Sequence, residues 1–413
     1  MEGSVNWMIS IVGLIVAFLI SLVIVELGSR VWLRRKERYY VWAPNVRFEF
    51  RPDPEVFPEL ERNVRFEINS DGERGGEPPQ SSRGLYRILV AGGSPAECAL
   101  LDQLTSWPGA LEQILKKAEN IRMLGASKVH VGNIGRSGTA SAHLNVLFQK
   151  VLPQYGHLNS IIVIVGGNDV WDWLKKGAPA VYAPPPVSIT DACFICPDRP
   201  FGWKPRASAL SQLLREIRIR MLHPIQVRHN TARWVGEARA MRAHATELRN
   251  SVADPKDMLA HFEHNFRELL NTARMHSDRV LVALQPWFEK NHYTSEELSH
   301  FWSGGMGDPY RGDEVTVFYS LEVCSQLMRL INLRAVKAAD DLGVEHLNLI
   351  PLLEPSLKNF YDFIHFTPAG AAVAAEAIAE TVLRHHANDT ADGFRQKIEQ
   401  AKIEFAKHGA LNT

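Results

Sequence analysis

The length, composition and charge of the chain set the first limits. With 413 residues, 46% hydrophobic and 22% charged, it is long enough for a large core and too apolar for a disordered protein. Its 46 basic and 46 acidic side chains cancel, which argues against a nucleic-acid-binding protein, since such proteins carry a strongly basic face. The four cysteines are too few for a disulfide scaffold, and one Cys-x-x-Cys without a second pair disfavours zinc.

An apolar run near the N-terminus, residues 7–25, is about long enough to cross a bilayer. A cleaved signal peptide is the alternative, but no lysine or arginine precedes the run and no small-residue cleavage site closes it. We therefore expect a retained single span, with residues 1–40 as an anchor and a basic juxtamembrane segment. The basic residues behind the span are Arg30, Arg34, Arg35, Lys36 and Arg38.

The next segment, residues 41–85, is rich in proline, asparagine, aspartate and glycine, as loops are. Only residues 64–69 alternate between apolar and polar side chains, which predicts a strand followed by a turn at 70–72. We expect this segment to form a small appendage on a catalytic domain that covers residues 86–386.

The catalytic domain alternates apolar strands with helices, the pattern of a three-layer α/β/α sandwich with a mainly parallel sheet. The predicted strands cover residues 87–91, 128–133, 160–165, 279–284 and 345–349. The predicted helices cover residues 107–117, 140–152, 327–342 and 368–385.

A long helical insertion, about residues 171–275, separates the third strand from the fourth, and a second long loop covers residues 291–318. The basic, helical composition of the insertion favours a solvated helical lid. The alternative is a surface that contacts acidic lipid headgroups or an anionic polymer. Its basic residues are Arg215, Arg218, Arg220, Arg228, Arg233, Arg239 and Arg242. Residues 387–413 form a polar tail that we expect to be helical.

Polar residues of catalytic types follow successive strands of the predicted sheet. Ser94 follows the first strand, Gly138 the second and Asn168 the third, whereas Asp362 and His365 precede the last helix. Because the carboxyl ends of parallel strands meet at one edge of a sheet, we expect these residues to converge there.

These residue types suit nucleophilic catalysis. A serine hydroxyl needs a base, for which His365 is the candidate, and Asp362 three residues earlier can orient the imidazole. The backbone N–H groups of Ser94 and Gly138 and the side-chain amide of Asn168 are candidate oxyanion donors. Each block also has a plainer interpretation, as a turn glycine, a helix cap or a surface ion pair, but four blocks in this order make coincidence improbable.

The four blocks resemble those of the SGNH hydrolases, the GDSL-type lipase/acylhydrolase family. The matches are Ser94, Gly138, Asn168 in Gly-Gly-Asn-Asp, and Asp362 with His365 in Asp-x-x-His, while residues 69–72 resemble membrane-tethered bacterial members. The first block reads Gly-Gly-Ser-Pro instead of Gly-Asp-Ser-Leu, so the oxyanion hole must form without an N–H from Pro95.

The resemblance implies a membrane-anchored serine esterase that needs no metal and no cofactor and cleaves an acyl ester of a lipid or an acylated carbohydrate. One alternative is an O-acyltransferase that moves an acetyl group to a sugar polymer with the same residues. The other is a catalytically inactive binding protein with the same fold, against which the intact triad argues.

The sequence gives conflicting indications of the side of the membrane. Five basic residues follow the span and none precedes it, so the positive-inside rule places the catalytic domain in the cytoplasm. In contrast, many tethered relatives act on envelope or extracellular esters, and a disulfide between Cys193 and Cys196 would form only outside the cytoplasm. We expect the cytoplasmic side from the charge asymmetry.

Overall fold

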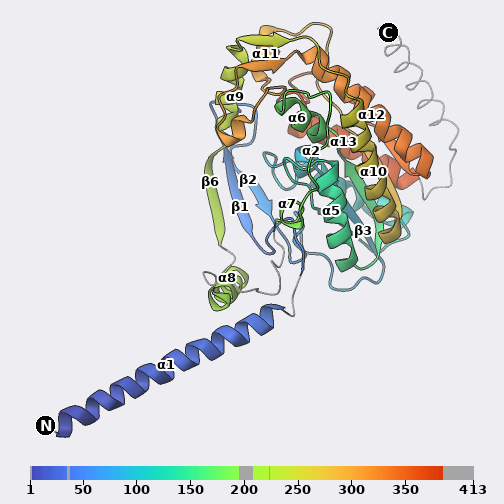
Figure 1. Ribbon diagram of the computed structural model, residues 1–413. Helices are drawn as coiled ribbons and strands as arrows, with labels where there is room; N and C mark the ends of the chain where they lie inside the picture. Colours follow the sequence, from blue (N-terminus) through green and yellow to red (C-terminus); the bar gives the residue numbers. More distant parts are fainter. Residues whose placement is uncertain (1, 35–37, 195–207, 223, 385–413) are drawn as a thin grey trace.

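The computed structural model describes residues 2–34, 38–194, 208–222 and 224–384 (Figure 1). Its central sheet has five strands in the order β10-β8-β5-β3-β4, and all neighbours are parallel. The bounds of these strands are β3 Leu85–Gly92, β4 Lys128–Asn133, β5 Leu158–Ile164, β8 Ser277–Leu284 and β10 Glu345–Asn348. All five predicted strands are present, and the predicted fold class is confirmed.

Helices cover both faces of this sheet. On one face α3 packs against α13, and on the other α10 packs against α5 and α12. The bounds of these helices are α3 Trp107–Leu115, α5 Ser141–Val151, α10 Lys256–His276, α12 Leu321–Leu342 and α13 Pro368–Arg384. Shorter helical segments are α2 Ser94–Glu97, α4 Ala118–Met123, η1 Leu152–Gln154, α6 Gly167–Lys175, α11 Ser295–His300, η2 Pro309–Arg311 and η3 Ile350–Leu352.

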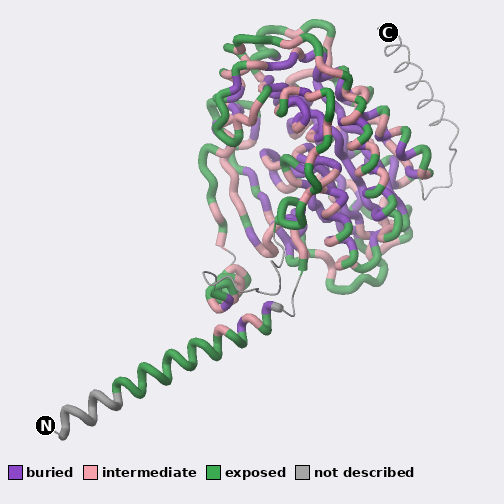
Figure 2. The backbone as a smooth tube through the Cα atoms, viewed as in Figure 1, coloured by how far each residue is buried: buried purple, intermediate pink, exposed green. Residues whose placement is uncertain are grey.

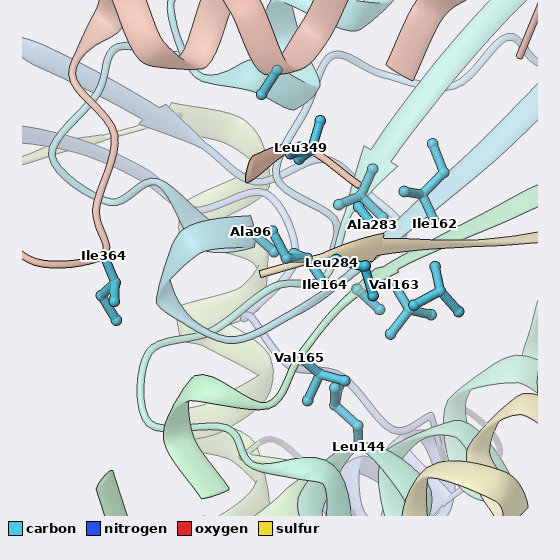
Figure 3. Packing of buried hydrophobic residues seen from close by; sticks show 14 of the residues in the cluster. Ala96, Leu144, Ile162, Val163, Ile164, Val165, Ala283, Leu284, Leu349 and Ile364 are labelled. Atoms are coloured by element: carbon cyan, nitrogen blue, oxygen red, sulfur yellow. The ribbon is translucent and has the colours of Figure 1, made fainter. Parts of the chain in front are cut away.

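The sheet forms the centre of the core because its strands are apolar on both faces. Ile162 and Val163 of β5 point to opposite faces and are both fully buried (Figure 3). Leu144 of α5 packs beside Val165 on one side of the sheet, where Figure 3 shows them together. Figure 2 shows the same layering, with buried residues concentrated in the sheet and the inner faces of the helices. Burial on both faces explains why these strands are continuous apolar runs.

The insertion contains strands as well as helices, which the sequence did not predict. Its elements are α7 Ile189–Ala192, α8 Ala209–Leu222, β6 Ile225–Thr231, α9 Trp234–Ala243 and β7 Glu247–Arg249, followed by α10. Strand β6 pairs in parallel with β1, Arg47–Pro52, which pairs antiparallel with β2, Val64–Glu67. Strand β7 pairs with β9, Val317–Tyr319, and so joins the insertion to the second long loop.

The N-terminal helix α1, Glu2–Arg34, extends away from the rest of the molecule (Figure 1). Its residues 11–33 are long and apolar enough to cross a membrane, and Figure 2 shows this stretch as mostly exposed. Arg35 and Lys36 of the basic cluster, Cys196 of the Cys-x-x-Cys pair and the predicted tail at 387–413 lie outside the described residues.

Candidate active site

Ser94 lies in the turn that directly follows β3, at the carboxyl edge of the sheet. It opens the short helix α2, and proline is tolerated at position 95 because N–H groups in the first helical turn have no intrahelical acceptor. Gly93 is required by crowding: a Cβ atom there would come within 2.4 Å of Nδ2 of Asn168. The sharp turn therefore places the serine and the asparagine amide next to each other.

His365 lies between Ser94 and Asp362 and contacts both. Its Nδ1 is 2.7 Å from Oδ2 and 2.9 Å from Oδ1 of Asp362, and its Nε2 is 2.8 Å from Oγ of Ser94. Because a carboxylate only accepts hydrogen bonds, Nδ1 carries the proton, and Nε2 is the acceptor for the serine hydroxyl. This is the tautomer that a general base for Ser94 requires.

Asp362 is buried, with 1% of its surface exposed, and is surrounded by donors. Its Oδ1 accepts the backbone N–H groups of Ile364 and His365 at 2.9 Å, and its Oδ2 accepts the indole N–H of Trp302 at 3.0 Å. Burial acts to raise the pKa of Asp362, but the imidazole of His365 and the backbone N–H groups of Ile364 and His365 outweigh it, so that the pKa is lowered. The carboxylate is therefore ionised and held in one orientation.

The turn that carries Asp362 and His365 is held by neighbours from both directions. The ring of Tyr361 stacks on the imidazole of His365, with centroids 5.4 Å apart and planes within 6°. The Tyr361 carbonyl accepts a hydrogen bond from the guanidinium of Arg239, which also donates to the carbonyls of Val56 and His300. Arg239 therefore connects the turn of Asp362 and His365 with the N-terminal segment and the second long loop, and it is not a solvated lid residue.

The candidate oxyanion donors lie on either side of the serine turn. Asn168 is at the start of α6, and its Nδ2 donates one hydrogen bond to the Thr139 carbonyl at 3.0 Å, so the other N–H is the candidate donor. Gly138 has a φ of +77°, and no atom lies within 4 Å of the Cβ position, so backbone conformation and not crowding favours glycine there. The backbone N–H of Ser94 is the third candidate.

Two carboxylates hold the loop 137–141, which carries the candidate oxyanion donor Gly138. The sequence did not indicate that these carboxylates hold this loop. Glu97, the last residue of α2, accepts the Ser137 backbone N–H at 2.6 Å. Asp169 accepts the backbone N–H of Ser141 at 3.0 Å and its hydroxyl at 2.5 Å. Burial raises the pKa of both carboxyls, that of Asp169 to about 7. The loop between residues 137 and 141 is thus fixed at both ends.

Arg74, from the segment before β3, holds the far end of α2. It is buried, and its guanidinium donates to the carbonyls of Glu97, Cys98 and Leu101. These carbonyls follow the last turn of α2, where helix carbonyls lack intrahelical partners. The Asn-Ser-Asp-Gly turn at residues 69–72 could have pointed to Arg74 in the sequence. Such a turn fixes the backbone just before this arginine and so gives its side chain a defined position.

A small cavity adjoins the serine turn at the carboxyl ends of β3, β5 and β8. Its volume is about 10 Å³, close to the minimum that holds one water molecule. Its lining includes Gly93, Pro95, Thr139, Asn168, Gln285 and Ile364. Strand β4 lies on one side of β3 and the next strand, β5, on the other, so the order of the strands reverses between β3 and β5. Open α/β sheets bind ligands at such a point.

Comparisons with known proteins give structural matches only. No family model matches the chain, and no curated protein matches it in sequence. The acetylxylan esterase Axe2 from Geobacillus stearothermophilus aligns with 71% of this chain and 93% of its own, at 12% identity and a TM-score of 0.36. An alpha/beta hydrolase, LAE5, from the metagenome of Lake Arreo aligns with 75% of this chain and 99% of its own, at 12% identity and a TM-score of 0.39.

A member of the lipolytic G-D-S-L family from Veillonella parvula is also similar. It aligns with 71% of this chain and 97% of its own, at 9% identity and a TM-score of 0.38. At such identities a structural match concerns the fold alone, and we base the function on the residues of the site.

Proposed function

We propose that the protein is a membrane-anchored serine esterase that cleaves carboxylic esters through Ser94, His365 and Asp362. The observation that carries the proposal is the continuous chain of contacts from the Ser94 hydroxyl through both nitrogens of His365 to the buried Asp362. An isolated serine hydroxyl is a poor nucleophile, and a neutral imidazole at hydrogen-bond distance activates it.

The reaction has two steps. Ser94 Oγ attacks the ester carbonyl and its proton moves to Nε2 of His365, while the oxyanion is held by the N–H groups of Ser94, Gly138 and Asn168. His365 then protonates the leaving alcohol, which gives an acyl-Ser94 ester. Water attacks this ester with His365 as the base, and the carboxylic acid and free Ser94 result.

The small cavity beside Ser94 supports a short acyl group. Its volume of about 10 Å³ is close to the minimum that holds one water molecule, so the cavity has no room for a long acyl chain. The backbone of β5 and the Asn168 helix close this side of the site, since Ile164, Val165, Gly166 and Gly167 all line the cavity. We therefore expect acetyl esters to be better substrates than butyryl or octanoyl esters.

The test is labelling and hydrolysis by the full-length protein in detergent. A fluorophosphonate probe should label the wild type but not Ser94→Ala, and His365→Ala should lose most labelling. Asp362→Asn should lose less, because part of the orientation of His365 survives. Among p-nitrophenyl esters, kcat/KM should fall from acetate to octanoate. Labelling that persists in Ser94→Ala would exclude this nucleophile.

An aromatic cluster next to the triad favours a second candidate, acetyl transfer to a sugar. The ring of Trp302, whose N–H contacts Asp362, lies 4.9 Å from Trp234, and Trp234 lies 5.4 Å from Tyr310, centre to centre. Tyr310 is 72% exposed and forms the outer end of the cluster. Aromatic faces of this kind provide apolar surface for the rings of a carbohydrate.

A competition assay separates the two candidates. A transferase should form acylated sugar when an oligosaccharide is added to the protein with p-nitrophenyl acetate, and Trp234→Ala should reduce that product. A hydrolase should release acetate at an unchanged rate and form no acylated sugar with any acceptor.

We further propose that α1 spans the membrane and that the catalytic domain faces the cytoplasm. The apolar run 7–25 of this helix and the five basic residues that follow the run support this orientation. Alkaline phosphatase and a cytosolic fluorescent reporter, each fused after Thr413, test it. A fluorescent fusion without phosphatase activity is expected, and an active phosphatase would show that the domain is exported.

A further inference from the structure

Helix α8 of the insertion is attached to the end of the apolar span. The carboxylate of Glu26 accepts the backbone N–H groups of Ala209 and Leu210 at 2.8 and 2.9 Å and the Ser208 hydroxyl at 2.9 Å. These are the N–H groups that a helix N-terminus leaves without intrahelical acceptors. Glu26 directly follows the apolar run 7–25 and lies about two helical turns before the end of the stretch 11–33, so α8 begins near the carboxyl-terminal end of the predicted span.

The surface of α8 is amphipathic, with its apolar side only partly covered. Ala209 is buried, whereas Leu214, Ile217 and Met221 are 57%, 42% and 76% exposed. Their spacing of three and four residues places them in one stripe along the helix. At 100° per residue, Gln212 lies on the opposite side of the helix from Met221.

Basic side chains border this apolar stripe. Arg218 and Arg220 lie on its two sides by the same helical geometry, and both are exposed. Long basic side chains at such positions keep their charged ends in the headgroup region while their stems cover apolar surface. In Figure 1 α8 is seen nearly end-on while α1 is seen along its length, so the two helices cross steeply.

We propose that α8 lies in the interface of an anionic bilayer, with Leu214, Ile217 and Met221 immersed among the lipid chains and Arg218 and Arg220 at the phosphates. The proposal rests on α1 spanning the membrane. Lipid then surrounds the end of the span at the level where α8 begins, and an apolar stripe with basic borders complements such a surface.

The second attachment orients the catalytic domain on the membrane. Residue Ile225, three positions after the end of α8, begins β6, and Arg47 of β1 pairs with it in parallel register. The three-stranded sheet is therefore connected to the bilayer through α8 as well as through α1. A single helix followed by a linker would leave the domain free to rotate, whereas two attachment points restrict it.

The test places the photoreactive residue p-benzoylphenylalanine at single positions of the full-length protein in nanodiscs of phosphatidylethanolamine and phosphatidylglycerol that contain an alkyne-tagged lipid. Irradiation at Ile217 or Met221 should give at least fivefold more lipid adduct than at Gln212, the matched control on the opposite side. Replacing phosphatidylglycerol by phosphatidylcholine, or combining Arg218→Gln with Arg220→Gln, should reduce the adduct at Met221 at least twofold.

A probe at Leu14, which is 70% exposed in the middle of the apolar run, reports separately on the span. Lipid adducts at Leu14 without adducts above the Gln212 level at Met221 would overturn the interfacial position of α8 and leave the span intact. Crosslinks from Met221 to a second copy of the chain in place of lipid would do the same. The absence of adducts at Leu14 and Met221 would overturn both proposals.

Discussion

The side chain of Glu97 accepts a hydrogen bond from the backbone N–H of Ser137 at 2.6 Å and a second one from the Ser137 hydroxyl. Glu97 ends the short helix that Ser94 opens, and Ser137 directly precedes Gly138. The carboxylate therefore connects the helix of Ser94 to the loop that carries a candidate oxyanion donor. It acts through these neighbours and is a positioning residue.

Replacing Glu97 by alanine should release this loop. We expect Glu97→Ala to lower kcat by about 100-fold with little change in KM, which is the size of effect seen when one oxyanion donor is lost. Glu97→Gln keeps an acceptor oxygen and should stay within about tenfold of the wild type, because its amide can still accept the backbone N–H. Steady-state kinetics on p-nitrophenyl acetate, with thermal unfolding as a check on folding, measure both. Equal loss in the two variants would contradict a positioning role.

Arg74 should matter for stability more than for substrate binding. Its guanidinium satisfies three backbone carbonyls around the end of α2, and burial lowers its pKa only to about 10, so it stays charged at neutral pH. Arg74→Met would leave the carbonyls of Glu97 and Leu101 without these donors, whereas the Cys98 carbonyl keeps the backbone N–H of Leu101. At about 1 kcal/mol or more for each carbonyl, the variant should lose about 2 kcal/mol or more of unfolding free energy. Urea unfolding in detergent measures this loss.

The matched control is Arg47→Gln. Arg47 is paired with Glu67 at 3.8 Å, both side chains are 44% exposed, and such a surface pair contributes about 0–1 kcal/mol. A loss at Arg74 no larger than the loss at Arg47 would show that the buried hydrogen bonds contribute little.

The strands, and the convergence of Ser94, Asn168 and His365, could be predicted because their signals are local. Each core strand is a continuous apolar run. Ser94 and Asn168 follow such strands and His365 precedes the last helix, so the parallel topology brings them to one edge. The roles of Arg239 and Trp302 could not be predicted in this way. The partner of Arg239 is the Tyr361 carbonyl and that of Trp302 is the Asp362 carboxylate, both far away in sequence. In addition, the sequence of a basic helix does not show whether one of its arginines faces solvent or a buried carbonyl.

Strand β6 escaped prediction for a related reason. Most of its residues are exposed, so its sequence lacks the clear alternation that predicts a half-buried strand. It exists because β1, about 180 residues earlier, offers a free edge to which it hydrogen-bonds in parallel. Similarly, the sequence shows Glu26 as the first charged residue after the apolar run 7–25. The structure adds that its carboxylate accepts the backbone N–H of Ala209 at the start of α8.

Trp302 should contribute to catalysis through its hydrogen bond to Asp362. Trp302→Phe keeps most of the aromatic surface but removes the indole N–H that Oδ2 of Asp362 accepts at 3.0 Å. We expect kcat to fall by about tenfold, corresponding to about 1.4 kcal/mol, with KM for p-nitrophenyl acetate unchanged. Trp234→Phe is the control, since its ring packs on Trp302. If both variants lose activity equally, packing and not the hydrogen bond is responsible.

Asp169 should make the stability of the fold depend on pH. Burial raises its pKa to about 7, whereas an unfolded aspartate titrates near 3.9. Between about pH 4 and 7 the folded protein holds a proton that the unfolded chain has released, so this carboxyl favours folding below pH 4 and its contribution declines as the pH rises to about 7. Asp169→Asn removes the titration and retains an acceptor for Ser141. Relative to the wild type, the variant should therefore gain stability as the pH increases, by at most about 1.4 kcal/mol per unit.

Urea unfolding at pH 5, 6, 7 and 8 measures this difference for Asp169→Asn and for the control Asp254→Asn, which changes an exposed carboxylate that accepts the backbone N–H of Lys256. The control provides the baseline for an aspartate-to-asparagine change at the surface. The difference in unfolding free energy between Asp169→Asn and the wild type should increase most steeply below pH 7. Above pH 7 it should level off, because the folded wild type has then lost the Asp169 proton. A difference that stays constant over the whole range would mean that Asp169 is already ionised in the folded protein and that its hydrogen bonds to Ser141 outweigh burial.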